Sequence, residues 1–368
     1  MGQELKSKLR REIVRLLEAG VSGRAFPGAS ACVGWREGDA DVFVPAVAGR
    51  VAPDGPAVEE GTPYDLASLT KPLVAMAALR MVVAGKVTLD ARADSLVNDV
   101  RGGPGGAKTL EALLRHRAGL AAWGGLYLDV PHDPGTAPAR RWILSEAARR
   151  QHEQDEPVVY SDLGYIIAGE MLARAAGQTL DQVVARYVTE PLGIDHEVYY
   201  AGALPSELRT QLVRRAAPTE RCEWRGRLVR GEVHDENCAA LGGVSGHAGM
   251  FGSARAVAAF GRTMLDVLDG RSDFLPPELL EGALADPGDG DTHRLGWDTK
   301  SAGESSAGRR MSANSFGHLG FTGTSIWCDR ARDVVVVLLT NRVHPSRANE
   351  KIRGFRPAFH DGVLALLD

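Results

Sequence analysis

Long hydrophobic runs are absent from this sequence of 368 residues. No stretch approaches the roughly 18 consecutive apolar residues that a membrane-spanning helix needs, so we expect no membrane span. A strong excess of charge is absent too, because 43 Lys and Arg face 47 Asp and Glu for a formal net charge of −4. This balance gives no general attraction to nucleic acid or to anionic membranes, and we expect neither as a partner.

An export signal is also missing from the first twenty residues. They place apolar and basic side chains at helical spacing instead, with Leu9, Ile13 and Leu17 on one face and residues such as Lys8 on the other. This pattern predicts an amphipathic surface helix that ends at Gly20. We therefore expect a cytoplasmic protein.

Cysteine is scarce. The four cysteines, Cys32, Cys222, Cys238 and Cys328, lack C-x-x-C spacing, which argues against a zinc ribbon or a dithiol redox pair. We expect buried free thiols, with a Cys222–Cys238 disulfide as the alternative. No H-E-x-x-H or comparable ligand spacing occurs, so we expect no metal. The glycine-rich segment 102–109 lacks the glycine that precedes the lysine of a phosphate loop, and we expect no cofactor.

Lysine is much less common than arginine in this sequence. It occurs only at positions 6, 8, 71, 86, 108, 300 and 351, and arginine supplies the rest. Lys71 is unusual because it stands in the apolar segment 64–76, three residues after Ser68. If a helix begins near Ser68, the two side chains lie about one turn apart on the same face.

The spacing of Ser68 and Lys71 suits a nucleophile and its base. A serine hydroxyl is a weak nucleophile until a base removes its proton. Arginine keeps its proton, whereas burial among apolar neighbours lowers the pKa of a lysine and lets it act as that base. S-x-x-K is a short pattern that recurs by chance, so a surface Ser and Lys on an ordinary helix is the competing interpretation.

Strand and helix patterns follow one another in three blocks. Strands are expected at 29–35 and 42–47, joined by a turn at 37–39, and the helix from Ser68 ends near Gly85. Helical patterns then dominate, at 110–116, 140–151, 162–176, 180–187 and 254–268. Strands return at 315–319, 322–328 and 334–339.

This order predicts a single α+β domain over residues 1–368. Strands from both chain ends would form one antiparallel sheet flanked by helices, in a lobe of about 1–88 and 241–368. A mainly helical lobe of about 89–240 would be inserted between them.

Tyr160 stands directly before the predicted helix 162–176, next to Ser161 and Asp162, either of which can cap that helix. Taken alone, this tyrosine is typical of a packing residue. The functional interpretation is that its phenol joins the proton network of Ser68 and Lys71, either as base during acylation or as proton donor to the leaving group.

Glycines crowd the segment 316–325, which reads FGHLGFTGTS and leads into a predicted strand. Glycine weakens a strand and often marks the close approach of a ligand or another backbone. A bare strand edge of this kind could offer the backbone N–H groups that a substrate carbonyl needs. A lone histidine such as His318 is usually structural.

Taken in this order, the motifs at Ser68, Tyr160 and His318 resemble those of the serine hydrolases of the class C β-lactamase and penicillin-binding-protein superfamily. Its members also include esterases, D-aminopeptidases and D-alanyl-D-alanine carboxypeptidases. The likeness extends over most of the chain, with further matching stretches at 113–120, 242–251 and 340–345. It implies a β-lactamase-like fold.

The resemblance also implies a role for each matching residue. Ser68 would be the acylated nucleophile and Lys71 its base partner, with Tyr160 in the role of the family's tyrosine. The backbone N–H groups of Ser68 and Phe321 would form the oxyanion hole. The residues implied to contact the substrate are Asp162, His318 and Gly320.

Two of these positions depart from the β-lactamase pattern. Asp162 stands where an asparagine is usual, so an amide donor is replaced by an acceptor. His318 stands where many β-lactamases have lysine, which removes a permanent cation. Both changes favour an esterase or a peptidase-like amidase, and the expected cytoplasmic location argues against peptidoglycan as substrate.

We therefore expect a serine hydrolase that forms an acyl-serine intermediate on a small ester or amide. The nearest alternative is a D-alanyl-D-alanine carboxypeptidase or D-aminopeptidase, and a slow-turnover binding or sensor protein is the alternative from another class. The segment with His234, Asp235 and Glu236 either lines the pocket or forms a solvated loop. His116 and His247 are expected to brace loops.

Overall fold

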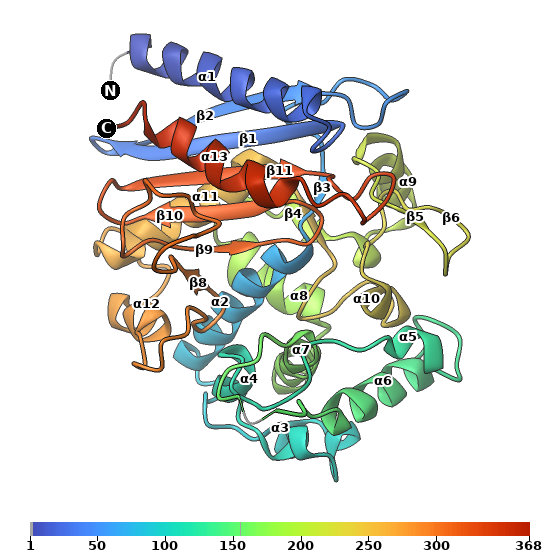
Figure 1. The fold of residues 1–368 in the computed structure, drawn as a ribbon. Coiled ribbons are helices and arrows are strands. Elements are labelled where there is room, and N and C mark those ends of the chain that lie inside the picture. Colours follow the sequence, from blue (N-terminus) through green and yellow to red (C-terminus); the bar gives the residue numbers. More distant parts are fainter. Residues whose placement is uncertain (1–2, 155) are drawn as a thin grey trace.

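A six-stranded antiparallel sheet forms the centre of the computed structural model, which describes residues 3–154 and 156–368 (Figure 1). Its strand order is β2-β1-β11-β10-β9-β8. The N-terminal part of the chain supplies β1 (Gly28–Glu37) and β2 (Ala40–Gly49). The C-terminal part supplies β8 (Asp298–Thr299), β9 (Phe316–Leu319), β10 (Ser325–Asp329) and β11 (Val334–Thr340). The predicted α+β fold, with one sheet built from both chain ends, is confirmed.

Strand β11 shows why this sheet is covered on both faces. All seven of its residues, VVVVLLT, are buried, as expected for a strand between two layers. Val336 and Leu338 pack with α1 (Gln3–Ser22) and α13 (Ile352–Leu364). Val335 and Val337 belong to the cluster on the other face, which includes α11 (Ala254–Leu268). The two-residue period of a strand therefore sends alternate side chains into different cores.

The remaining helices lie mostly below the sheet in Figure 1. They are α2 (Thr70–Val83), α3 (Ala93–Leu96), α4 (Leu110–Leu114), α5 (Leu126–Asp129), α6 (Ala137–Arg149), α7 (Asp162–Ala176), α8 (Leu180–Val184), α9 (Ser206–Arg215), α10 (Glu236–Ala240) and α12 (Pro277–Leu284). Two small sheets complete the fold. One pairs β3 (Tyr64–Asp65) and β4 (Val198–Tyr200) with β7 (Met250–Gly252), and the other pairs β5 (Arg221–Cys222) with β6 (Arg227–Leu228).

Several predicted boundaries were wrong in ways that matter for the site. The helix expected from Ser68 begins at Thr70, because residues 67–69 form a 3-10 turn. Strand β10 begins at Ser325 rather than at residue 322, because residues 320–324 form a turn. The region 89–240 contains short strands as well as helices, and helix α13 was not predicted.

One hydrophobic cluster joins the two predicted lobes. It includes Leu113, Ile143 and Leu163 from the mainly helical part and Phe260 and Val337 beside the sheet. The lobe boundaries near 88 and 240 stay a prediction.

Other expectations concerned membranes and disulfides. None of the described helices is both long and apolar enough to cross a membrane. All four cysteines are free and buried, so the alternative of a Cys222–Cys238 disulfide is wrong.

Candidate active site

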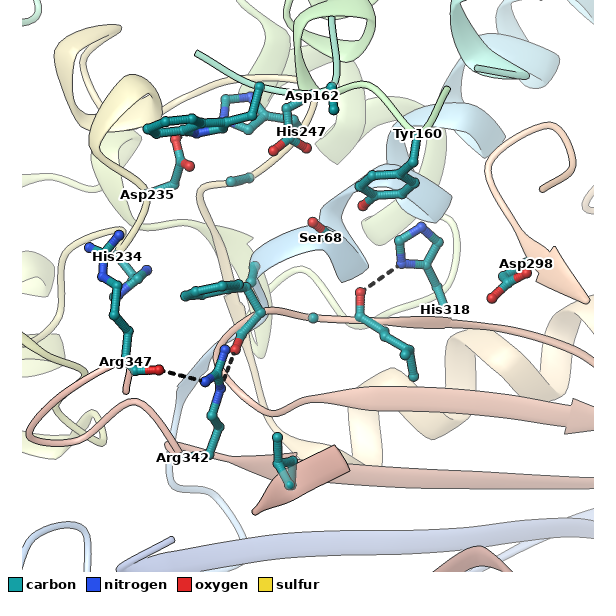
Figure 2. A pocket seen from close by; sticks show the side chains of 18 of the residues that line it. Ser68, Tyr160, Asp162, His234, Asp235, His247, Asp298, His318, Arg342 and Arg347 are labelled. Atoms are coloured by element: carbon teal, nitrogen blue, oxygen red, sulfur yellow. Dashed lines mark hydrogen bonds and ion pairs between the residues drawn. The ribbon is translucent and has the colours of Figure 1, made fainter. Parts of the chain in front are cut away.

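A cavity of about 810 Å³ lies between the sheet edge and the helical part of the chain (Figure 2). Six of the seven site residues predicted from the sequence line it: Ser68, Tyr160, Asp162, His318, Gly320 and Phe321. The seventh, Lys71, is fully buried and contacts Ser68. The fold thus brings together side chains that the sequence places up to about 250 residues apart.

A strained turn presents Ser68 to the cavity. Ala67 has φ +49, a left-handed conformation that costs free energy for a residue with a Cβ. The Ala67 N–H donates to Asp65 Oδ1 at 2.8 Å, which holds this turn in place. Helix α2 starts immediately afterwards, so Ser68 stands at its N-terminal end.

Lys71 lies in the first turn of α2 and is completely shielded from solvent. Its Nζ donates to Ser68 Oγ at 2.9 Å, as the one-turn spacing predicted. A shorter contact of 2.6 Å joins Nζ to Asp162 Oδ1, and a longer one of 3.4 Å reaches the His247 carbonyl. The nucleophile, the amine and a carboxylate therefore form one connected chain.

The predicted lowering of the Lys71 pKa is wrong. Burial does disfavour the ammonium and acts to lower the pKa, but the Asp162 carboxylate and the Tyr160 phenol act in the opposite direction and outweigh it. The result is a pKa above the ordinary value for lysine, so Lys71 is an ammonium at neutral pH. The apolar neighbours could be seen in the local sequence, whereas Asp162 is 91 residues away.

Tyr160 faces Ser68 from the other side of the cavity (Figure 2). Its ring packs between His116, at a centroid distance of 4.5 Å, and His293, at 5.3 Å. Lys71 Nζ lies 4.7 Å from the ring centroid. Burial raises the pKa of this phenol, and the nearby ammonium only partly offsets that effect. Tyr160 is therefore a protonated phenol at neutral pH.

The start of α7 fixes both Tyr160 and Asp162. Ser161 caps this helix, since its Oγ accepts from the Gly164 N–H at 3.1 Å. The Ser161 N–H donates to His116 Nδ1 at 2.9 Å, so His116 braces the loop as predicted. Burial and the Lys71 charge hold the pKa of His116 well below its usual range.

Two backbone N–H groups at Ser68 and Phe321 have no acceptor among the described residues, and both residues line the cavity. Thr322 Oγ1 donates to the Asp65 carbonyl at 2.8 Å, and Thr324 Oγ1 donates to the Leu66 carbonyl at 3.0 Å. These bonds tie the turn 320–324 to the segment before Ser68. The arrangement is suited to binding an oxyanion between the two N–H groups.

Gly320 explains why this turn can approach so closely. A Cβ added to it would lie 1.9 Å from Thr324 Oγ1 and 2.6 Å from the Leu66 carbonyl oxygen. No side chain fits there. The predicted link between crowded glycines and close backbone approach is confirmed at this position.

His318 is neutral in this setting. Its Nδ1 donates to the Leu319 carbonyl at 2.8 Å, which leaves Nε2 as an acceptor (Figure 2). Burial, with the Lys71 charge as a second cause, lowers the pKa of His318 to about 3. The position thus supplies a polar side chain without charge.

The segment 234–236 lines the cavity, so the alternative of a solvated loop is wrong. His234 and Glu236 are each only 5% exposed. Asp235 caps α10 by accepting from the Cys238 N–H at 2.7 Å, and its carboxylate contacts His247 Nε2 at 2.8 Å. His247 therefore braces this segment, as predicted.

Sequence reasoning missed other cavity residues. These are Trp123, His293, Asp298, Arg342, Arg353 and Arg356. They come from loops, from β8 and from α13. Of the six, Arg342 alone lies in a stretch that the family resemblance marked, 340–345, and no role was predicted for it. Arg342 Nε donates to the Phe321 carbonyl at 2.8 Å, and Arg356 Nη2 donates to the Gly320 carbonyl at 2.6 Å. In the part of the chain that the structure describes, neither arginine forms an ion pair.

The donor groups of the cavity do not suggest a metal centre. Across residues 3–154 and 156–368, no three His, Cys, Asp or Glu side chains gather as a ligand set.

Comparison with known sequences gave a match over most of the chain. The sequence model of the family described as β-lactamase matches residues 13–356. An N-acetylmuramyl-L-alanine amidase of Bacillus subtilis (strain 168) is 28% identical over 312 residues, which cover 77% of this chain and 68% of that protein. A protein of Escherichia coli (strain K12), provisionally named D-alanyl-D-alanine carboxypeptidase, is 27% identical over 77% of this chain and 70% of its own length.

Solved structures share the fold. EstCE1, described as a hydrolase with promiscuous acyltransferase activity, superimposes with a TM-score of 0.75 at 19% identity, over 97% of this chain and 99% of its own. A class C β-lactamase gives a TM-score of 0.71 at 16% identity, over 98% of both chains. At these identities the likeness concerns architecture alone.

Proposed function

The chain belongs to the β-lactamase family, and from this premise we propose that it is a serine hydrolase that acts on a small ester or amide through an acyl-serine intermediate. The observation that carries the proposal is the 2.9 Å contact between Lys71 Nζ and Ser68 Oγ. It lies at the edge of a cavity with two backbone N–H groups that have no acceptor within the described part of the chain. A nucleophile, a proton network and an oxyanion site are the components that acyl transfer requires.

In the proposed reaction, Ser68 Oγ attacks the substrate carbonyl while its proton enters the network around Lys71. The N–H groups of Ser68 and Phe321 stabilise the oxyanion of the tetrahedral intermediate. Tyr160, held protonated by its raised pKa, donates a proton to the leaving group. Water then hydrolyses the acyl-serine.

The neutral state of His318 favours an ester or a peptidase-like amide as the substrate, rather than a β-lactam. A β-lactam carboxylate would meet no permanent charge at this position, because the pKa of His318 is about 3. The Asp162 carboxylate accepts from Lys71 and carries no N–H that could donate a hydrogen bond to a substrate carbonyl, unlike an asparagine.

A D-alanyl-D-alanine carboxypeptidase or D-aminopeptidase is the second candidate, and one observation favours the carboxypeptidase. Arg342 and Arg356 are each 7% exposed, line the cavity and lack a carboxylate partner in the described chain. The carboxylate of a peptide terminus would provide one. One of the two sequence relatives is provisionally named a D-alanyl-D-alanine carboxypeptidase.

Mass spectrometry after exposure to a fluorophosphonate tests the proposed function. We expect one adduct, on Ser68, which is lost in Ser68→Ala and retained in Ser95→Ala, a matched change at an exposed serine outside the cavity. Absence of an adduct on the native protein would instead favour the slow-turnover binding or sensor protein.

Substrate preference needs a separate panel. p-Nitrophenyl esters, D-amino-acid amides and a chromogenic cephalosporin would be compared on native protein and Ser68→Ala. A D-alanyl-D-alanine peptide and its C-terminal amide would be added, because only the free carboxylate can pair with arginine. Preference for the free acid would support the carboxypeptidase, and preference for esters would support the esterase. The cytoplasmic location stays a prediction.

A further inference from the structure

Every N–H of the Lys71 ammonium already has an acceptor. The group carries three N–H donors and no lone pair. Ser68 Oγ at 2.9 Å, Asp162 Oδ1 at 2.6 Å and the His247 carbonyl at 3.4 Å accept from it, and the Tyr160 hydroxyl is a further hydrogen-bond partner. In this state Lys71 cannot accept the proton of Ser68. The acyl-serine mechanism therefore needs a further group that first takes a proton from Lys71.

Asp162 is placed to be that group. It is the first residue of α7, and its backbone N–H donates to the Ala122 carbonyl at 2.8 Å. The side chain is 18% exposed, whereas the Lys71 side chain is fully buried. The contact of 2.6 Å is short enough for direct proton transfer between the two groups.

The other groups around Lys71 are less suited. The Tyr160 hydroxyl is hydrogen-bonded to Lys71 and to Ser68, whereas Tyr165 presents its ring, with the centroid 5.5 Å from Nζ. Tyr165 donates its hydroxyl to the Leu114 carbonyl at 2.9 Å, and burial raises the pKa of both phenols. Neither is therefore a phenolate that could take a proton.

The histidines and carboxylates near Lys71 lead to the same conclusion. His116 Nδ1 accepts from the Ser161 N–H and His318 Nδ1 donates to the Leu319 carbonyl, and within the described residues neither histidine is hydrogen-bonded to Lys71. Among the described residues, Asp162 is the only carboxylate that pairs with Lys71.

We propose that Asp162 receives the proton that leaves the serine, with Lys71 as the carrier. Lys71 transfers one proton to Asp162 and becomes an amine, and that amine takes the proton of Ser68 as Oγ bonds to the substrate carbonyl carbon. The carbonyl π bond breaks and its electron pair moves to oxygen. Asp162 ends as a neutral acid, Lys71 as an ammonium and the intermediate as an oxyanion, so net charge is conserved.

This inference rests on the proposed acyl-serine mechanism and gives Asp162 a role other than the substrate contact implied by the resemblance. Asp162 acts through Lys71 and does not touch the substrate in this scheme. An asparagine at this position could hold Lys71 by its carbonyl but could not store the proton.

The test is the rate of fluorophosphonate labelling of Ser68 between pH 5 and 10, in native protein, Asp162→Asn and Asp162→Glu. In Asp162→Asn the proton acceptor is gone, so labelling must wait for Lys71 to lose its proton to solvent. We expect a rate at pH 7 up to roughly 10²-fold below native, the size of a lost general-base contribution. The deficit is smaller to the extent that loss of the carboxylate lowers the pKa of Lys71. The deficit should shrink as pH rises, because the uncharged amine then becomes more abundant.

Two further variants separate a proton role from a structural one. Asp162→Glu keeps a carboxylate and should recover part of the rate at pH 7. Asp39→Asn, a matched change in the exposed β1–β2 turn outside the cavity, should behave as native. Thermal unfolding of each variant shows whether it is folded.

The outcomes distinguish the two proposals. Failure of the native protein to label at Ser68 would overturn the proposed function itself. Two results would overturn the role of Asp162 while leaving the proposed function intact, provided that the native protein is labelled. One is an Asp162→Asn variant that is labelled at the native rate. The other is a pH profile of its labelling rate that runs parallel to the native profile at all pH values.

Discussion

At the scale of single residues, the protonation state of a buried basic side chain in this cavity depends on whether a carboxylate contacts it. Lys71 and His318 are both buried, yet burial is outweighed only at Lys71, where a carboxylate is in contact. Within residues 3–154 and 156–368, His318 has no carboxylate in contact, and it stays neutral. Two basic residues in one cavity therefore carry different charges at neutral pH.

Lys71→Arg tests whether charge alone suffices at this position. The guanidinium keeps the positive charge but does not release a proton, so it cannot pass the serine proton to Asp162. We expect kcat/KM to fall by roughly 10²-fold or more. Lys86→Arg, at an exposed lysine just after α2, is the matched control and should retain native activity. Substantial acylation by Lys71→Arg would remove Lys71 from the proton path.

The lowered pKa of His318 predicts that the free energy of unfolding depends on pH. The unfolded chain takes up a proton near pH 6.5 and the folded chain only near pH 3, so the neutral histidine stabilises the fold above pH 6.5 and this contribution is lost as pH falls between those values. The slope of the free energy of unfolding from this group is about 1.4 kcal/mol per pH unit inside the window.

Urea titrations at pH 7, 6 and 5 would measure this slope in native protein and in His318→Gln. In His318→Gln the free energy of unfolding should fall less steeply as pH falls, because about one proton fewer is taken up on unfolding. His196→Gln is the control, since the His196 side chain is 70% exposed. Equal slopes in native protein and His318→Gln would show that the folded and unfolded states bind this proton equally.

At the scale of elements, the turn between β9 and β10 decides whether an oxyanion site exists. It is held to the segment before Ser68 by two threonine hydroxyls, and from α13 by Arg356, which donates to the Gly320 and Thr324 carbonyls. Elements from both ends of the chain therefore position the Phe321 N–H.

Gly320→Ala should disrupt this arrangement. The new methyl group would overlap Thr324 Oγ1 and the Leu66 carbonyl, so the turn must move away from Ser68. We expect a loss of about 1–3 kcal/mol in the free energy of unfolding and a fall in kcat greater than any change in KM. Gly282→Ala is the control, because a Cβ there meets nothing within 4 Å and α12 gains helix propensity. Native kcat in Gly320→Ala would argue against an oxyanion role for this turn.

At the scale of the whole molecule, the cavity exists only where the sheet part and the helical part meet. A single hydrophobic cluster runs through both, from Ile143 in α6 to Val337 in β11. Such a shared core couples the stability of the two parts.

We therefore expect one cooperative unfolding transition. Far-UV circular dichroism and tryptophan fluorescence should give the same urea midpoint. Ile143→Ala, at a position with no exposed surface, should shift both midpoints equally and cost about 2–5 kcal/mol. Separate midpoints, or a shift in only one probe, would show that the two parts unfold independently.

The sequence by itself determined the local features of this protein. The one-turn spacing of Ser68 and Lys71, the cap before α7, the valine-rich strand β11 and the glycine at position 320 all express short-range geometry, which a few neighbouring residues dictate. The family resemblance linked these segments and led to the correct fold.

Only the tertiary structure decided the charge state of the site. Asp162 meets Lys71 across 91 residues, and that contact reverses the pKa shift that burial would cause. Arg356 lines the cavity although no motif marked it, and Arg342, which lies in the matching stretch 340–345, had no predicted role there. Electrostatic interactions depend on distance in space, and a linear pattern does not state which remote side chains come within a few ångströms.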